Sequence, residues 1–302
     1  MDISKLELFL DIIETKNLTL SGERLGYTQS GVSHAIRKLE SELGIALITR
    51  TNHGVEVTND GNLILPHLRS IVSNYHRLND TLDSIQDLQR GSITIGTYSS
   101  IASHWLPEVI RKFTNSYPNV SITIREAGMD TLEQWLLNGT IDLAFGSWKK
   151  HPNYNFHSLA RDPLCAIVGK DYPINTDYLE NFPMHAFEEF PFIASVKGVD
   201  YDVADAFKVS SVDPLVSFKC SDDHTIISMV SKGLGVSLLP QLFVAGFEHL
   251  VQVVPVKPCF MRTLGIYTVS EDTMSLAAKK FLKLATDLIS TQLQNETNSS
   301  IF

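Results

Sequence analysis

A segment near the N-terminus, residues 28–43, carries an apolar stripe and a polar face at helical spacing, and this pattern restricts the fold more than any other. Five apolar side chains recur three or four residues apart and so line one buried side of a helix: Val32, Ala35, Ile36, Leu39 and Leu43. The polar residues of the other side are Ser30, Ser33, His34 and Arg37. Short hydroxyls can hydrogen-bond phosphates, and long donors can reach base edges. The pattern is typical of a recognition helix that enters the major groove of DNA, with Thr28 or Ser30 as its N-cap.

Two further helices are expected ahead of this segment. Residues 5–15 place apolar side chains on one face, and a second, short helix fits residues 19–26. Three helices of this size form a helix-turn-helix domain. The first expected domain, a winged helix-turn-helix, therefore covers residues 1–58.

This stretch closely resembles the LysR-type transcriptional regulators, because many residues match the family in order and spacing. The matching residues are Leu6, Phe9, Leu25, Thr28, Gln29, Ser30, Val32, Ser33, Ile36, Leu39, Glu40, Leu43, Gly44, Leu47, Arg50, Thr58 and Gly61. Four positions depart from the family's usual residues: Ser21 and Gly22 replace two alanines, Ile48 replaces a phenylalanine and Gly31 replaces a proline. These replacements are small or apolar and should keep the packing, although Gly22 costs its helix roughly 1 kcal/mol against alanine.

The net charge of the chain does not by itself indicate a DNA-binding protein. The chain has a formal net charge of -9, and residues 1–58 hold more Asp and Glu than Lys and Arg, so nonspecific affinity for DNA should be modest. The basic residues that matter lie in the helix-turn-helix and the hairpin-like segment after it. We expect DNA contacts from Thr28, Gln29, Ser30, Ser33, His34, Arg37, Lys38, Arg50 and His53. A basic residue on a helix is often only solvated, and this alternative suits Lys5 and Lys16 best.

A long helix is expected over residues 58–89, between two globular parts. Its apolar residues alternate steps of three and four, which is typical of a coiled-coil seam: Leu68, Ile71, Tyr75, Leu78, Leu82 and Ile85. The alternative is an amphipathic helix that lies on its own domain. A helix between two globular parts has little to bury against except a second copy of itself, so we expect a homodimer through residues 59–90. Such a dimer would read double-stranded DNA at an operator built as an interrupted inverted repeat.

From residue 91 onward, short apolar runs alternate with longer helical stretches, which is the pattern of an α/β fold with doubly wound, parallel sheets. The expected strands are 92–96, 120–125, 141–146, 164–169, 192–195, 215–219, 236–239 and 264–269. The expected helices are 102–117, 131–138, 200–208, 222–232 and 275–292. The polar tail, residues 295–302, is expected to be disordered.

The family resemblance extends through this half of the chain. The segments LPEVIRKFTNSYPNV, NGTIDLAFG and SKGLGVSLLP match the family's effector domain, which is built like a periplasmic solute-binding protein. The resemblance implies an effector-binding domain over residues 91–302, with lobe I formed by 91–161 and 267–294 and lobe II by 162–266. It also implies a tetramer of two dimers that responds to a small-molecule effector and often bends its DNA site. RNA polymerase is a further expected partner.

Ligands of doubly wound sheets bind beyond the carboxyl ends of strands. This rule selects the expected effector contacts Ser99, Ser100, Ile101, Thr131, Gly146, Ser195, Val196 and Lys197. Ser99 and Ser100 stand where the family commonly places hydroxyls against its effector, and an exposed helix start behind them would favour a carboxylate or another anion. The alternative is that these serines only cap the helix. For Lys197, the alternative is a solvated loop lysine.

Other classes of protein fit less well. An enzyme is not expected, because Ser99 and His104 have no orienting acid and no G-x-S-x-G, P-loop, H-E-x-x-H or G-x-G-x-x-G motif occurs. Cys165, Cys220 and Cys259 are isolated, so we expect structural thiols, with a redox sensor as the alternative, and neither a metal site nor a cofactor. A transport-type solute-binding protein would fit the α/β half but not the helix-turn-helix. Without an apolar run of 18 residues or a signal-peptide pattern, the chain is expected to be cytoplasmic, with no membrane partner.

Overall fold

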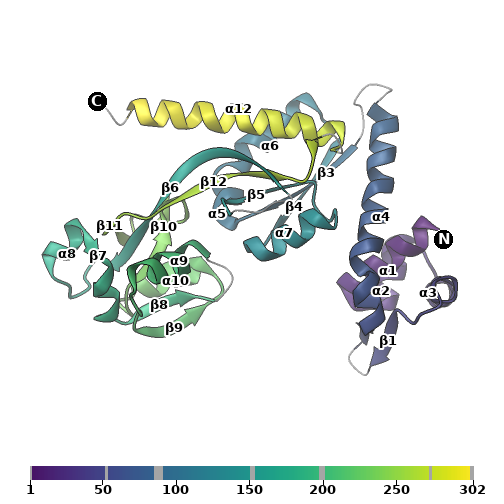
Figure 1. Ribbon diagram of the computed structural model, residues 1–302, viewed down its shortest axis with the longest axis horizontal. Coiled ribbons are helices and arrows are strands. Elements are labelled where there is room, and N and C mark those ends of the chain that lie inside the picture. The colour runs from purple at the N-terminus through teal and green to yellow at the C-terminus, as the bar shows by residue number, and fades with distance from the viewer. Residues whose placement is uncertain are drawn as a thin grey trace. The chain divides into compact units, whose positions relative to one another are not determined.

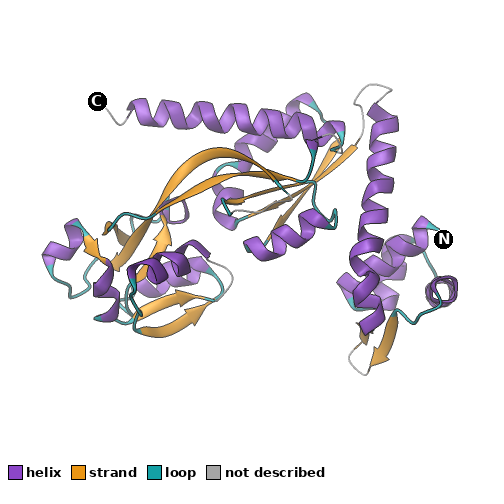
Figure 2. Cartoon of the chain, viewed as in Figure 1, coloured by secondary structure: helices purple, strands orange, loops and turns teal. Residues whose placement is uncertain are grey.

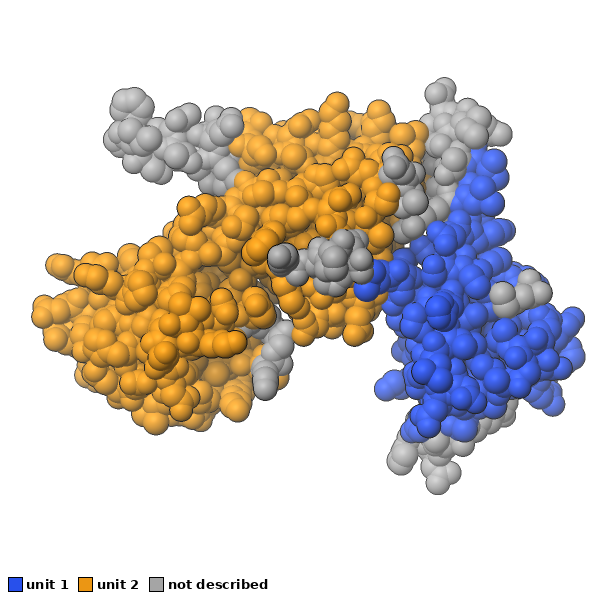
Figure 3. All heavy atoms as spheres, viewed as in Figure 1, with its two compact units in different colours: residues 1–87, 137–140 blue, residues 88–136, 141–302 orange. Residues whose placement is uncertain are grey.

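The structure, a computed structural model, describes residues 2–51, 54–84, 91–149, 154–196, 201–271 and 274–299. Two compact units are distinguished in Figure 3: residues 1–87 with 137–140 form unit 1, and residues 88–136 with 141–302 form unit 2. Unit 1 is mainly helical and contains a β-hairpin. Unit 2 is an α/β domain whose two lobes share long strands.

Unit 1 runs from the N-terminus to a long helix (Figure 1). In chain order its elements are α1 (Ile3–Thr15), α2 (Leu18–Leu25), α3 (Gln29–Leu43), β1 (Ile48–Thr51), β2 (Gly54–Val57) and α4 (Asn59–Ser84). Strands β1 and β2 pair antiparallel and form the hairpin, or wing. The two expected helices and the recognition helix are confirmed to within two residues at each end.

Thr28, rather than Ser30, caps the recognition helix α3. The hydroxyl oxygen of Thr28 accepts a hydrogen bond from the backbone N–H of Gly31 at 3.1 Å, which satisfies one of the unpaired donors of the first turn. At the other end, Gly44 has a φ of 73°, a left-handed conformation that glycine adopts at little cost. Its N–H donates to the carbonyl of Glu40 and closes the last turn. Both ends of the helix are thus defined by local residues.

Apolar side chains from α1, α3 and α4 form the core of unit 1. Its almost fully buried members include Leu6, Phe9, Ile12, Val32, Ile36, Leu39, Leu47, Leu68 and Val72. The apolar stripe of the recognition helix is therefore its core face. Close packing explains the glycine at position 22. A Cβ there would lie 2.8 Å from Val32 Cγ2, so an alanine would force the core to shift.

The burial of Leu68 corrects one expectation for α4. Leu68 is 3% exposed and packs in the core of unit 1, so it is not available to a seam between two copies. The first part of α4 thus lies on its own domain. Farther along, Ile71, Tyr75, Leu78 and Leu82 are 38–55% exposed. Ile85 lies outside the described residues.

Unit 2 is built on an eight-stranded mixed sheet, and its longest strands run through both lobes (Figure 2). Its strands are β3 (Gly91–Thr97), β4 (Val120–Glu126), β5 (Leu143–Ser147), β6 (Asn155–Gly169), β7 (Phe182–Pro183), β10 (Ser237–Pro240), β11 (Val251–Lys257) and β12 (Met261–Thr268). The order is β4-β3-β5-β12-β6-β11-β7, with β10 paired to β6. Strands β8 (Phe192–Ser195) and β9 (Val216–Cys220) form a separate parallel pair in lobe II.

Helices cover the sheets of both lobes. They are α5 (Ser99–His104), α6 (Leu106–Ser116), α7 (Met129–Leu137), α8 (Thr176–Glu180), the 3-10 helix η1 (Met184–Glu188), α9 (Tyr201–Ser210), α10 (Asp223–Ser231), α11 (Gln241–Val244) and α12 (Leu276–Ser299). In lobe I, Phe113 of α6 meets Phe281 of α12 edge to face, with ring centroids 5.2 Å apart. Phe182, Phe187 and Phe192 belong to the core of lobe II. Each lobe therefore has an aromatic core of its own.

The sheet is not parallel throughout, which corrects the expectation for unit 2. Strands β3, β4 and β5 are parallel, but β12 runs antiparallel to both β5 and β6. The expected strand 164–169 is only the apolar, buried end of β6, which is 15 residues long. The expected lobe boundaries, 161–162 and 266–267, fall inside β6 and β12. Strand β11 is not among the expected strands, because Pro255 interrupts its apolar run.

Two expectations for helices are also corrected. The single helix expected over 102–117 is divided into α5 and α6, because Pro107 in the first turn of α6 has no N–H with which to continue the preceding helix. The tail expected to be disordered from Asn295 is helical through Ser299, as the end of α12.

Candidate functional site

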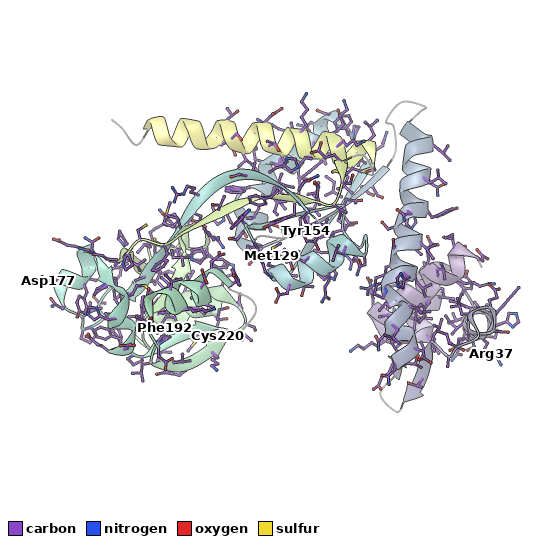
Figure 4. The ribbon with its side chains drawn as sticks, in the orientation of Figure 1. Arg37, Met129, Tyr154, Asp177, Phe192 and Cys220 are labelled. Carbon is purple, nitrogen blue, oxygen red and sulfur yellow. The ribbon has the colours of Figure 1, made fainter. Side chains whose placement is uncertain are left out.

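The polar face of α3 is exposed in unit 1. Its exposed residues are Thr28, Gln29, Ser30, His34, Arg37 and Lys38, and Ser33 is half-buried among them. The Nε of Arg37, labelled in Figure 4, donates to the carbonyl of Ser33 at 3.1 Å and so holds the guanidinium group beside the helix. The face therefore offers hydroxyl, amide, imidazole and cationic donors, which suit both phosphates and base edges.

The wing lies next in the chain and is attached to α1. The backbone N–H of Val55 in β2 donates to the carbonyl of Lys16, and the close approach leaves no room for a Cβ at Gly54, where φ is 123°. Arg50, an expected DNA contact, lies in β1 opposite Val55. His53, the other expected contact here, lies outside the described residues.

Unit 2 contains a cavity of about 270 Å³ between its lobes. Lobe I contributes residues after β3 and at the end of β4, and β12 contributes an arginine. Lobe II contributes the start of α9, the residue after β9, the end of β10 and a residue of α11. The lining residues are Tyr98, Ser99, Ser100, Glu126, Ala127, Gly128, Tyr201, Asp202, Ser221, Pro240, Phe243 and Arg262. The cavity thus lies at the carboxyl ends of parallel strands, where open α/β sheets bind their ligands.

Arg262 is a buried cation in the wall of this cavity. Its Nε and Nη2 lie 2.8 and 2.7 Å from Asp162 Oδ2, and both side chains are less than a tenth exposed. Nη2 also lies 3.5 Å from the hydroxyl oxygen of Ser100, and the guanidinium carbon is 5.9 Å from the centre of the Tyr98 ring. Asp162 accepts a further hydrogen bond from the backbone N–H of Leu242 at 3.0 Å. The pair therefore has the additional polar contacts that a buried ion pair requires.

Asp202, in the first turn of α9, faces the cavity from lobe II. The hydroxyl of Ser147, at the end of β5 in lobe I, donates to Asp202 Oδ1 at 2.9 Å, so this hydrogen bond joins the two lobes. Burial raises the pKa of Asp202, while the charge of Arg262 and the hydrogen bond from Ser147 act in the opposite direction. A carboxylate has several acceptor positions, so Asp202 can accept further hydrogen bonds from a ligand.

Among the expected effector contacts, Ser99 and Ser100 line the cavity. They do not cap α5 with their side chains, because the N-cap residue is Tyr98 and no side-chain capping bond forms there. Ile101 does not line the cavity, because its side chain is fully buried in the core of lobe I. Successive residues of a helix point in different directions, so a contact at Ser100 does not extend to its neighbour.

The remaining expected contacts do not line the cavity. Thr131 is exposed on α7, and Gly146 is enclosed by side chains of lobe I. Ser195 ends strand β8 and Val196 follows it, but neither lines the cavity. The strand-end rule locates the edge of a sheet, but it does not tell which side chains there turn toward the cavity. Lys197 lies outside the described residues.

Sequence reasoning missed three charged lining residues, Glu126, Asp202 and Arg262. Glu126 is the last residue of β4, so the strand-end rule could have found it. Asp202 lies within a helix, and Arg262 lies within a strand, where that rule does not look. A lone arginine in the otherwise uncharged β12 was the available signal, because a charge inside a buried strand needs a partner.

The three cysteines lie in different environments. Cys165 is buried, Cys220 is half-buried and Cys259 is exposed, and all are free. Burial, followed by the charge of Asp162, raises the pKa of Cys165 to about 11, so this thiol is protonated at neutral pH. In the described ranges, no group of three or more His, Cys, Asp or Glu side chains could hold a metal ion.

Comparisons with known proteins agree with both halves of the chain. Residues 3–62 match the model "Bacterial regulatory helix-turn-helix protein, lysR family", and residues 86–289 match "LysR substrate binding domain". The chain is 28% identical over 292 residues to YvbU of Bacillus subtilis (strain 168), an uncharacterized HTH-type transcriptional regulator, with 95% of this chain and 99% of that protein covered.

Solved structures share the fold as well. Full-length CbnR, determined with its target DNA, superposes with a TM-score of 0.68 at 18% identity and covers 94% of this chain and 99% of that one. The effector binding domain of QuiR, determined with shikimate, gives a TM-score of 0.60 at 20% identity and covers 67% of this chain and 98% of that one.

A helix-turn-helix unit with an exposed polar recognition face, joined to a two-lobed α/β unit with an interlobe cavity, defines a DNA-binding regulator with a ligand-binding domain. The chain belongs to the family of LysR-type transcriptional regulators. Within the described residues, no helix has both the length and the apolar character that crossing a membrane requires.

Proposed function

We propose that this LysR-type regulator reads an operator with the polar face of α3 and alters transcription when a small carboxylate-bearing effector binds the interlobe cavity. The observation that carries the proposal is the wall formed by Ser99, Ser100 and Arg262, which combines two hydroxyls with a guanidinium group. The proposed division of the chain is 1–58 for DNA binding, 59–90 for dimerisation and 91–302 for effector binding. Lobe I comprises 91–161 and 267–294, and lobe II comprises 162–266.

This wall suits a carboxylate for chemical reasons. Each serine hydroxyl can donate one hydrogen bond, and a guanidinium group has five N–H donors, of which Asp162 receives those from Nε and Nη2. Hydrogen bonds between charged donors and a carboxylate are stronger than neutral ones. The neighbour QuiR was determined with shikimate. A ligand held between two lobes shifts the molecule toward whichever arrangement it binds more tightly.

The proposal includes the assembly that a regulator of this kind requires. The exposed apolar face of α4, with Ile71, Tyr75, Leu78 and Leu82, supports a homodimer through this helix. The two recognition helices of a dimer would read an interrupted inverted repeat, and two dimers would form the tetramer. We place the protein in the cytoplasm, where it meets DNA and RNA polymerase, and assign it no catalytic activity.

The experiment tests DNA reading and effector response on the same full-length variants. S33A and R37A should each weaken binding to the cognate operator, because a base-directed contact contributes roughly 1 to 3 kcal/mol. R50A should weaken binding to all DNA sequences alike and flatten the salt dependence, as loss of a phosphate contact does. Gel-shift titrations at two salt concentrations measure both effects. Unchanged operator affinity in S33A and R37A would contradict the assignment of the reading face.

The effector arm uses a promoter reporter under inducing and non-inducing growth conditions. S99A and S100A should keep operator binding and lose most of the induction, since their contacts lie in unit 2. S103A is the matched control, because Ser103 lies on the same helix outside the cavity lining. Full induction in both S99A and S100A would mean that the effector binds elsewhere.

A further inference from the structure

The charges around the interlobe cavity do not balance. Among the described lining residues, Arg262 is the cation, and Glu126 and Asp202 are the carboxylates. Arg262 already has a partner in Asp162, at 2.7 Å between Nη2 and Oδ2, and both side chains are buried. The charge of Arg262 is therefore compensated before a ligand arrives, and two carboxylates remain.

These two carboxylates have no ion-pair partner among the described residues. Asp202 accepts a hydrogen bond from Ser147 at 2.9 Å, but a hydroxyl carries no charge. Burial raises the pKa of Asp202, against the opposing effects of the Arg262 charge and the Ser147 hydrogen bond. Asp202 is half-buried, and a carboxylate taken partly out of water without an ion-pair partner is unfavourable, so a cationic group on a ligand would reduce this cost.

Lys149 is a described cation close to this wall, but its charge is directed elsewhere. Its Nζ lies 5.5 Å from the centre of the Tyr201 ring, and Tyr201 lines the cavity next to Asp202. The same Nζ contacts Asp130 at 3.1 Å and Glu133 at 3.6 Å. Lys149 is thus held by two other carboxylates and is not part of the cavity lining.

The cavity therefore has donors and acceptors on different elements. Ser99 and Ser100 on α5 and Arg262 on β12 donate hydrogen bonds, and Arg262 Nη2 lies 3.5 Å from the hydroxyl oxygen of Ser100. The ionised carboxylates of Asp202 on α9 and Glu126 on β4 accept hydrogen bonds and have no donor. A ligand that bears only an anionic group would satisfy the donors and leave the carboxylates unpaired.

We infer that the effector is a zwitterion of the amino-acid type, with its carboxylate bound by Ser99, Ser100 and Arg262 and its ammonium group bound by Asp202, beside Glu126. This inference rests on the proposed function and deepens it, because that function requires only the carboxylate. An ammonium group has three N–H donors and no acceptor, which complements a carboxylate that still has free acceptor positions. The cavity volume of about 270 Å³ accommodates a molecule of this size.

Matched probes test the inference on the full-length protein. The probes are the protein L-amino acids, the 2-hydroxy acids with the same side chains, and the amines that lack the carboxyl group. Thermal shift selects the binders, because only a ligand that prefers the folded state raises the melting temperature, and calorimetry then gives the Kd. We expect at least one amino acid to bind at least about tenfold more tightly than its 2-hydroxy acid and its amine, since both ends of the molecule contribute a charged hydrogen bond.

Two variants assign the preference to the carboxylates. D202N should weaken amino-acid binding at least about tenfold and leave binding of the 2-hydroxy acid within about twofold. E126Q, at an exposed position, should weaken amino-acid binding less and keeps the test valid if D202N does not fold. The matched control is D205N, which removes the same charge from the exposed side of α9, outside the cavity lining. D205N should bind all probes as the parent protein does.

The results that would overturn the zwitterion differ from those that would overturn the proposed function. Equal binding of amino acids and 2-hydroxy acids, or a preference that survives in both D202N and E126Q, would overturn the zwitterion and leave a carboxylate-bearing effector in place. A complete lack of binding in all three probe series would also overturn it. The effector part of the proposed function fails on a different result, namely full induction in both S99A and S100A in the reporter assay.

Discussion

The ion pair of Asp162 and Arg262 links the two long strands of unit 2. The two residues are directly opposite each other in the antiparallel pairing of β6 and β12, although they are 100 positions apart in the chain. Directly opposed side chains on neighbouring strands are close enough to interact. The strand register thus places the arginine in the cavity wall together with the carboxylate that compensates its charge.

Removing one member of this pair should destabilise unit 2 strongly. R262M or D162N should lower the free energy of unfolding by about 3 to 5 kcal/mol, because each leaves the other charge buried without a partner. The double variant should recover most of this loss, since no unpaired charge remains. Urea unfolding can be followed by tryptophan fluorescence, because Trp105, Trp135 and Trp148 all belong to unit 2.

R111M provides the control for the ion-pair experiment. It breaks the ion pair of Arg111 with Glu108 on the surface of α6, where Arg111 is exposed and Glu108 is partly exposed. Exposed pairs of this kind contribute little to stability, so R111M should unfold at the urea concentration of the parent protein. If the effects of R262M and D162N simply add in the double variant, the two charges do not stabilise each other.

The pKa of Asp202 gives a prediction for stability against pH. Burial is the largest influence and raises this pKa above 3.8, so the folded chain binds the proton more tightly than the unfolded chain does. The contribution of protonated Asp202 to the stability of the fold is therefore complete below pH 3.8 and is lost as the pH rises through the pKa of the folded state. D202N is neutral at every pH, and its amide oxygen can still accept the hydrogen bond from Ser147.

The melting temperature of D202N should therefore equal that of the parent protein near pH 3.8 and exceed it at neutral pH. Differential scanning calorimetry in buffers from acid to neutral pH measures the difference, with D205N as the matched control. A difference that does not change with pH would show that the burial of the charge is not its cause.

At the scale of single residues, the sequence identified the cavity-lining residues that follow a local rule. Ser99 and Ser100 lie two and three residues beyond the end of β3, and the rule that ligands bind beyond strand ends selects them. Arg262 and Asp202 reach the same cavity only through the pairing of β12 with β6 and the packing of lobe II against lobe I. Their places in the lining depend on residues distant in the chain, so the strand-end rule could not identify them.

At the scale of elements, α4 changes its environment along its length. Leu68 and Val72 are buried in unit 1, while Leu78 and Leu82 are more than half exposed. One apolar stripe of 3.5-residue period therefore covers its own domain first and becomes free for another partner afterwards. The spacing of the apolar residues is the same in the buried and the exposed part of α4, so the spacing alone could not distinguish the two parts.

Charges on the free part of this stripe should dissociate the proposed dimer. L78D with L82D places unpaired carboxylates in the seam, so light scattering should show the mass of a monomer, and operator affinity should fall at least about tenfold because two half-sites are no longer held together. S73D is the control, since position 73 lies about 200° around the helix from Ile71. A double variant that keeps the mass of the parent would exclude α4 as the interface.

Helices and strands with regular patterns were predicted more closely than those with exceptions. The capped helix α3 and the parallel strands β3 and β4 agree with the expectations to within about one residue at most ends. The division of α5 from α6 and the whole of β11 depend on Pro107 and Pro255, which break the pattern without ending the packing. Strand β6 was predicted only where both of its faces are buried.

At the scale of the whole molecule, the two units divide the work by position in the chain. The exposed polar face belongs to residues 28–38, and the interlobe cavity belongs to residues 98–262. Each unit has its own apolar core, and no core cluster found in the described chain draws residues from both units. Substitutions in the cavity should therefore alter the response to an effector without altering the DNA sequence that is read.

The construction of the cavity wall has a consequence for evolutionary change. Its side chains come from separate segments, from the residues after β3 to the start of α9, and they surround an ion pair fixed by the two strands that cross between the lobes. Point mutations can therefore exchange one recognised chemical group at a time while the scaffold persists. Duplicated copies of such a gene can diverge toward new metabolites by single steps, each yielding a folded protein that still recognises its ancestral promoter.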